Sequence, residues 1–291
     1  AVHDEPGFFG CLSASDGLFV GKPSMDALPA ALLGASHRIT VQLGTKVTAA
    51  EFDNGWRLSG TTLPKPGSSS AADISELGKY DALVLTDVGN LLRGRAGHVA
   101  ITGQAAVRAL AAVSAAASQA ERMPLFALMM SFESPGSGLP FDAASIQGGR
   151  VRWLAKDSSK PGRERADGRE CWVAITTEAF GKELLGSRDA TGALPAQTEE
   201  YLSSRTDTMF EILQRDLSTI GLTLPAPAFM RAHRWGSAYV GGQPPGDPAA
   251  CIHSAAARLA VAGDFVAGGG AGGALKSGIA AADALVDSCQ Q

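Results

Sequence analysis

The sequence lacks the marks of several large protein classes. No apolar run approaches the roughly 18 to 20 residues that a membrane-spanning helix needs, so we expect no bilayer span. There is no basic tract and no interleaving of aromatic with basic residues, and Lys+Arg 25 against Asp+Glu 29 gives a formal net charge of −4. Nucleic acid is therefore not an expected partner.

Cysteine is scarce and scattered. Cys11, Cys171, Cys251 and Cys289 form no C-x-x-C pair, so the sequence indicates neither a zinc site nor a disulfide framework. We predict buried free thiols. We expect no signal peptide in this sequence, and because the first residue is Ala1 rather than Met, we expect that part of the translated chain was removed or lies outside this sequence.

What is present predicts a globular protein with a mixed order of strands and helices. Hydrophobic residues make up 45% of the 291 residues, enough for a buried core. We predict a hairpin of two strands separated by Asp53-Asn54-Gly55 and a strand buried on both faces at Lys79–Val88. We also predict a helix over 103–123 that ends before Pro124 and another helix over 197–220. The order favours an α/β or α+β fold with two interwoven lobes.

The polar loop from Lys156 to Arg169 joins two further predicted strands. Its segment Asp157-Ser158-Ser159-Lys160 is interpreted either as a substrate-side loop or as a turn capped by Asp and Ser side chains. We predict that three tryptophans are core residues of strands, with a place beside a bound ligand as the second interpretation: Trp153, Trp172 and Trp235.

A glycine-rich stretch near the end, VAGDFVAGGGAGGALKSG, matches G-x-G-x-x-G at Gly268, Gly270 and Gly273. A dinucleotide-binding fingerprint needs a second parallel strand with an acidic residue about 20 residues further on. Only a helix and a short tail follow here, so this interpretation fails on context.

A different ligand role fits the same stretch. Gly263-Asp264 follows a predicted buried strand and would place a carboxylate at the sheet's carboxyl edge. The N–H groups of a helix expected to begin near Gly273 and Ala274 would suit an electron-rich ligand. The alternative is a glycine-rich turn that only packs against the sheet.

These segments resemble FAD-dependent amine oxidases and renalase-like oxidoreductases. The resemblance rests on RLAVAGDF with GGALKSGIAAA, LFVGKPSMDALPAALL, VQLGTKVTAAEFDNGWRL, KYDALVLTDV, VRWLAKDSSKPGR and AHRW, and it covers almost the whole chain from about Gly17. It implies a two-lobed fold of the FAD-dependent amine oxidase type with an incomplete N-terminal Rossmann unit. The implied parts are residues 17–120 in the FAD-binding lobe, 121–250 in a strand-rich substrate lobe, and 251–291 as the FAD-contacting strand and helix.

The resemblance also implies roles for single residues. Asp264, after Gly263, would bind the ribityl hydroxyls of FAD, and the backbone of Gly273 and Ala274 would face the isoalloxazine ring. Val47 would offer backbone hydrogen bonds to adenine. His233 and Trp235 are the weaker, substrate-side catalytic candidates; a strand histidine held in the core is the alternative for His233.

The chain departs from this family where the N-terminal G-x-G-x-x-G unit would be. Phe265 replaces a usual Trp, Ala271-Gly272 replaces a bulkier pair, and Lys276 replaces an apolar residue, so the flavin could be retained or lost. One hypothesis is an oxidoreductase that transfers hydride from an amine- or dihydropyridine-like donor to FAD. The other is a degenerate, non-catalytic relative whose incomplete sheet is covered by a partner chain. The Ala1 start, with the resemblance to plant and algal members, favours a chloroplast location.

Overall fold

The computed structural model divides the protein into two units. It describes residues 20–62, 74–87, 99–117, 121–187, 194–241, 250–268 and 270–290. The first unit comprises residues 1–40 and 123–238, and the second comprises 41–122 and 239–291. Cys11 lies outside the described residues. Each unit combines helices with strands, so the mixed α/β fold class is confirmed.

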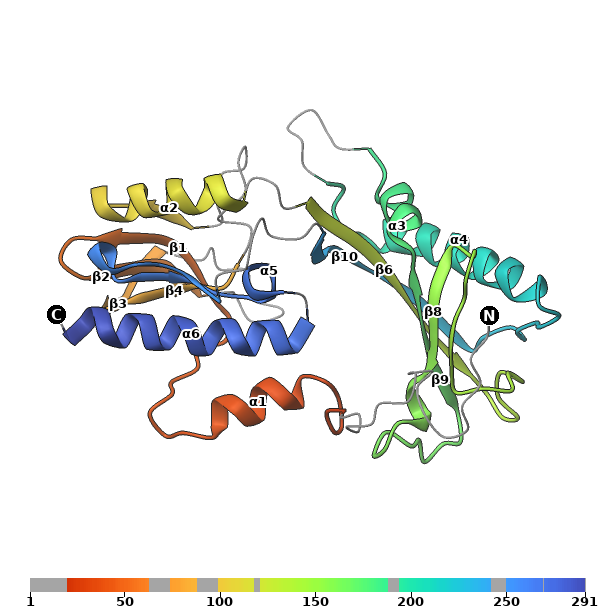
Figure 1. Cartoon of the computed structure of the whole chain (residues 1–291). Helices are drawn as coiled ribbons and strands as arrows, with labels where there is room; N and C mark the ends of the chain where they lie inside the picture. Colours follow the sequence, from red (N-terminus) through yellow and green to blue (C-terminus); the bar gives the residue numbers. More distant parts are fainter. Residues whose placement is uncertain are drawn as a thin grey trace. The chain divides into compact units, whose positions relative to one another are not determined.

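A five-stranded sheet forms the centre of the first unit. Its order is β10-β6-β9-β8-β7, with β6 at Glu121–Phe132, β7 at Ala143–Ser145, β8 at Val151–Lys156, β9 at Glu170–Thr176 and β10 at Phe229–Gly241. Helices α3 (Glu178–Leu185) and α4 (Glu199–Ser218) lie together on one side of this sheet (Figure 1). The helix α1 (Ala27–Gly34) also belongs to this unit, and none of its residues is buried.

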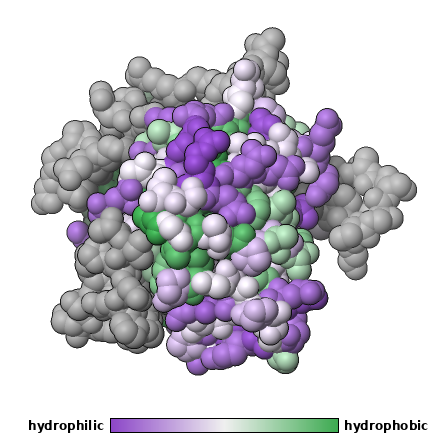
Figure 2. All heavy atoms as spheres, turned by 90° about the vertical axis from the view of Figure 1, so that its right-hand side faces the viewer, coloured by the Kyte–Doolittle hydropathy of each residue, from purple (hydrophilic) through white to green (hydrophobic). Residues whose placement is uncertain are grey.

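The core of the first unit follows from alternation along its strands. In β6, Phe126, Leu128, Met130 and Phe132 are buried at every second position, as expected for a strand with one face on the core. They pack with Met209 and other α4 residues. Figure 2 shows that hydrophobic residues also gather in the middle of one outer face, between hydrophilic ones.

Local hydrogen bonds fix where the helices of this unit begin and how α4 meets the sheet. The Thr177 hydroxyl accepts from Phe180 N at the start of α3, and Thr198 accepts from Tyr201 N at the start of α4. Near the end of α4, Asp216 Oδ2 accepts from Val151 N at 3.0 Å, which joins the helix to β8.

Two small sheets lie between helices in the second unit. One has the order β3-β2-β1-β5 and the other β11-β12-β4. Their strands are β1 (Thr45–Phe52), β2 (Trp56–Thr62), β3 (Ile74–Tyr80), β4 (Leu83–Leu85), β5 (Ala100–Thr102), β11 (Ile252–Ser254) and β12 (Leu259–Val261). Helix α2 (Gln104–Ala117) lies on one side of these strands and α6 (Gly270–Gln290) on the other (Figure 1).

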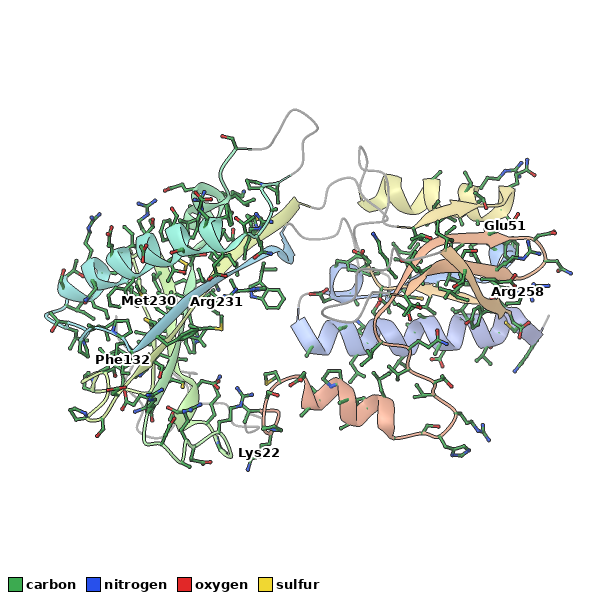
Figure 3. The ribbon with its side chains drawn as sticks, turned by 180° about the vertical axis from the view of Figure 1, so that it is seen from behind. Lys22, Glu51, Phe132, Met230, Arg231 and Arg258 are labelled. Carbon is green, nitrogen blue, oxygen red and sulfur yellow. The ribbon has the colours of Figure 1, made fainter. Side chains whose placement is uncertain are left out.

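The predicted hairpin is confirmed, and its tip is tied to the C-terminal part of the unit. Asn54 has a φ of 53°, the left-handed conformation that an Asn-Gly turn provides. The buried Trp56 donates from Nε1 to Ala257 O at 3.0 Å, and Arg258 donates from Nη2 to Asn54 O at 2.7 Å. Figure 3 labels Arg258 beside these strands.

Several sequence predictions need correction. Within 79–87, the described part of the segment predicted as one strand over Lys79–Val88, the chain forms parts of two strands in different sheets, because it breaks at Asp81-Ala82. Val84 is 42% exposed, so β4 is not buried on both faces. β6 begins at Glu121, before Pro124 rather than after it, and α3 was not predicted. Trp172 is buried as expected, whereas Trp235 is 53% exposed.

Of the cysteines that the structure describes, each is free, but none is buried. Cys171 and Cys251 are half-buried and Cys289 is exposed. Cys289 lies in the last turn of α6, where both small and polar residues face solvent. Partial burial raises the pKa of the Cys251 thiol.

Candidate functional site

The candidate cofactor site is the strand–turn–helix segment at the C-terminal end of the second unit. β12 is completely buried and pairs in parallel with β4, with Leu259 opposite Leu83. After two further residues the chain forms a short helix, α5 (Asp264–Ala267), which was not predicted. Asp264 is therefore the first residue of α5, just beyond the strand end where it was expected.

The long helix α6 begins earlier than the sequence predicted. It starts at Gly270 rather than near Gly273. The four N–H groups without a partner in an α-helix are the first four, so Gly273 belongs to this set and Ala274 lies inside the helix. Of the two residues expected to present free N–H groups, the structure places only Gly273 in that position.

A buried serine joins the start of this segment to α6. Ser277 is fully buried, and its Oγ accepts a hydrogen bond from Gly263 N at 3.0 Å. This bond satisfies the backbone group just before α5, and a buried group left without it would cost free energy. Gly263 and Asp264 are thereby held against the second turn of α6.

The glycines of the turn have two different reasons to be glycine. A Cβ atom on Gly273 would overlap the carbonyl oxygen of Gly268, so no side chain fits there. Gly268 and Gly270 instead have φ values of 103° and 86°, which favour glycine, and a Cβ atom on either would meet open space. Gly272 also faces open space. This side of the turn is bare backbone, which a flat ligand can approach closely.

Val47 lies on β1 at a place where one backbone edge is not covered by a described strand. It pairs with Gly60 of β2, whereas β5 pairs only with Ala49 to Glu51. The register shifts between Val47 and Ala49. The uncovered edge could form the backbone hydrogen bonds that the sequence predicts for adenine, and this role stays a prediction.

The two catalytic candidates lie in the first unit, on β10. The rings of His233 and Trp235 are in edge-to-face contact, with centroids 4.8 Å apart and an interplanar angle of 73°. They point to the same face because residues two apart on a strand do so. His233 is half-buried and Trp235 is exposed, so both are accessible to a ligand.

The Asp157 loop, which the sequence left as a substrate-side loop or a capped turn, is a turn fixed by ion pairs. Asp157 Oδ1 lies 2.6 Å from Arg163 Nη1 and 2.8 Å from Lys160 Nζ. Arg163 also donates from Nη2 to Gly21 O at 3.0 Å, which anchors the chain before α1. Beside this loop is an open hollow of about 540 Å³ lined by Pro23, Asp157, Ser158, Gly162, Arg163, Glu164, Arg165, Ala166, Asp167 and Cys171.

A polar cluster around Glu170 was missed by the sequence analysis. Glu170 Oε2 accepts from Ser137 N at 2.9 Å, Ser137 Oγ at 2.8 Å and Trp172 Nε1 at 3.0 Å. Lys156 lies 3.3 Å from Glu170 Oε1 and 3.1 Å from Asp142 Oδ1. Burial alone would raise the pKa of Glu170, but these donors together lower it from 4.5 to about 2.

The same cluster raises the pKa of Lys156. Burial alone would lower that pKa, but the hydrogen bond with Asp142 and the charge of Glu170 outweigh it. No signal in the sequence brings these residues together, because Ser137, Asp142, Lys156 and Glu170 come from different strands and loops. Their contacts are with one another, so the cluster serves to fix the loop before β7.

Two further features concern the described residues alone. Among them, no helix is long and apolar enough to cross a membrane. No group of three or more His, Cys, Asp or Glu side chains in the described ranges is arranged to hold a metal ion.

Comparison with known proteins identifies the fold. No protein-family model matches the chain. It is similar to the crystal structure of a protein assigned as a protoporphyrinogen oxidase from Exiguobacterium sp. 255-15, with a TM-score of 0.52 and 13% identity over 92% of this chain and 51% of that one. It is also similar to a triple mutant of putrescine oxidase with redesigned cofactor binding, with a TM-score of 0.50 and 10% identity over 90% of this chain and 52% of that one.

These likenesses, at low identity, define a class of fold. The chain has a fold of the FAD-dependent amine oxidase type. It spans about half the length of each of these two structures. The renalase-like assignment within that class is finer than the fold and stays a prediction.

Proposed function

We propose that the chain is the flavin-contacting and substrate-side part of an FAD-dependent oxidoreductase of the amine oxidase or renalase type. It would take a hydride from an amine- or dihydropyridine-like donor, and the bound flavin would supply the electron acceptor. The observation that carries the proposal is the open space at Gly268, Gly270 and Gly272, a few residues after Asp264. The fold class supports it independently.

The residues of this turn fit FAD by their chemistry. A carboxylate such as Asp264 accepts hydrogen bonds from the hydroxyls of a ribityl chain. The N–H groups at the start of α6, Gly273 included, stabilise negative charge on a ring edge. Gly263 N is already held by Ser277, so its part is to fix Asp264 rather than to bind the ligand.

Two other predicted sites would complete the function. The uncovered backbone of Val47 would bind adenine. His233 and Trp235 would face the donor, with Trp235 offering an apolar surface and His233 an imidazole that can form a hydrogen bond with the donor. The chain spans about half the length of these structural neighbours, and the proposal concerns only the contacts that its own residues would make.

The test is a titration of the purified protein with FAD, read by the quenching of flavin fluorescence and by flavin absorbance after dialysis. Asp264→Ala should weaken binding by about tenfold to a hundredfold, because a hydrogen bond to a charged group contributes about 1.5 to 3 kcal/mol. Asp287→Ala, an exposed acid of α6 far along the helix, is the matched control and should bind as the unchanged protein does. Equal binding by both variants would contradict the site.

A second function, a non-catalytic subunit of a larger assembly, is favoured by one observation. β4 is the last strand in the order of its described sheet, and Val84 on it is 42% exposed. A partner chain that covers this strand would remove apolar surface from water. A flavin-free protein that sediments as a folded monomer would count against this candidate.

A further inference from the structure

Helix α6 presents an apolar seam on the face that points away from its own unit. Leu275, Ile279 and Val286 are 58%, 57% and 54% exposed. With Ala282 and Cys289, which are also exposed, they are spaced four, three, four and three residues apart. This spacing is that of the a and d positions in a two-helix coiled coil.

The seam is separate from the face by which α6 packs in the monomer. Ser277, Ala281 and Leu285 are buried, four residues apart, and Ala281 and Leu285 pack against Ala260 and Ala262 beside β12. With 100° per residue, the centre of the exposed set lies about 120° around the helix from the centre of the buried set, so the two sets occupy different faces. Internal packing therefore does not explain why apolar residues recur along the exposed face.

Charges beside the seam select one way of pairing two copies of α6. If two helices run antiparallel with Leu275 level with the partner subunit's Val286, Ile279 lies level with the partner subunit's Ala282. Lys276 and Asp283 are both exposed and lie beside the seam on the same side of it. In this register Lys276 lies near the partner subunit's Asp283, and the symmetry of the pair forms the same contact a second time. A parallel pair would bring no opposite charges together at these positions.

We propose that α6 forms an antiparallel pair with α6 of a second copy of this chain. The occupant is the same chain because the seam is complementary to itself in both apolar layers and both charge pairs. The seam from Leu275 to Val286 is about 18 Å long, which is short beside the roughly 800 Å² per partner of a standard interface. We therefore expect a weak dimer, with a dissociation constant on the order of 10 to 100 μM.

The first experiment is sedimentation equilibrium of the purified protein over a range of concentrations, from about a tenth of to ten times that dissociation constant. The unchanged protein should move from monomer to dimer across the range. Ile279→Asp should remain monomeric throughout. Val107→Asp, at a 50% exposed apolar position of α2, is the control and should dimerise as the unchanged protein does.

The second experiment tests the antiparallel register by reversing charges. Lys276→Asp should weaken dimerisation by about two- to tenfold, since it affects two symmetric pairs. Lys276→Asp combined with Asp283→Lys should restore it, whereas Lys276→Asp with Asp287→Lys, which is off the seam, should not. Circular dichroism on each variant checks that the fold is kept.

These outcomes decide the proposal without reference to flavin. A protein that stays monomeric over the whole range, an Ile279→Asp variant that dimerises normally, or equal behaviour of the two double variants would each overturn it. FAD binding by the Asp264 site leaves all three measurements unaffected, so failure of the dimer and failure of the proposed function can be told apart.

Discussion

Replacing Glu170 by Gln should remove a pH-dependent part of the stability of the first unit. The side chain is 25% exposed, and its carboxylate accepts the four hydrogen bonds from Ser137, Trp172 and Lys156. Gln keeps the size but loses the charge, and its amide group would turn an N–H₂ toward at least one of these donors. Leaving buried donors without an acceptor costs about 1 to 3 kcal/mol.

The magnitude can be worked from the pKa. A carboxyl whose pKa falls from 4.5 in the unfolded chain to about 2 in the folded protein contributes about 3 kcal/mol of stability. Exposure of a quarter of the side chain to solvent reduces this to about 1.5 to 2 kcal/mol. Because the folded pKa is the lower one, the contribution is fully present above pH 4.5 and is lost as the pH falls from 4.5 towards 2.

The assay is urea unfolding followed by tryptophan fluorescence at pH 7 and at pH 3. At pH 7, Glu170→Gln should lower the free energy of unfolding by about 1.5 to 2 kcal/mol, and at pH 3 by clearly less. Glu133→Gln, in an exposed pair with Arg169, is the matched control and should change it by at most about 0.5 kcal/mol at either pH. The reasoning is refuted if Glu170→Gln costs the same at both pH values, or no more than the control.

Two further changes test how single positions shape the helices. Gly273→Ala should destabilise the second unit by about 1 to 3 kcal/mol, because the new methyl group overlaps Gly268 O. Gly272→Ala on the same helix faces open space and should be neutral or stabilise by up to about 1 kcal/mol. Thermal unfolding compares the two variants, and equal stability would contradict the packing at this turn. Thr198→Ala should lower the free energy of unfolding by about 0.5 to 2 kcal/mol, because it removes the cap of α4. Thr208→Ala should lower it little, because the Thr208 hydroxyl donates back to Ser204 O on the exposed side of α4. Chemical unfolding measures both, and a larger decrease for Thr208→Ala would argue against the cap.

Local patterns predicted the elements whose cause is local. The Asn-Gly hairpin and α4 are confirmed because turn chemistry and helical periodicity act within a few residues. The short helices and strands were missed where tertiary contacts decide them. The apolar run from Lys79 is one case: its composition resembles a single buried strand, but Leu83 N donates to Arg258 O, far along the chain, and draws the second half into another sheet.

The charged clusters were beyond the sequence for the same reason. Asp157 and Arg163 are six residues apart and visible as a block, but the bond from Arg163 to Gly21 O spans 142 positions. Glu170 and Ser137 meet only because β6 and β9 are neighbours in the sheet. No spacing rule connects residues whose proximity is set by strand order.

The glycine stretch shows why a motif needs its structure before it can be given a function. The sequence alone does not distinguish Gly268, Gly270, Gly272 and Gly273. Three of them match the dinucleotide-binding fingerprint G-x-G-x-x-G, although the second strand that this fingerprint needs does not follow. The structure separates a glycine excluded from any side chain by its neighbour's backbone from glycines that leave backbone open to solvent. A ligand can approach the backbone closely at glycines of the second kind, whereas the contribution proposed for Gly273 is its N–H group alone. The open positions follow Asp264 closely in the chain, and Gly270 and Gly272 belong to the first turn of α6, where N–H groups have no partner within the helix. The proposed flavin site rests on this proximity in the chain of a carboxylate and a helix N-terminus.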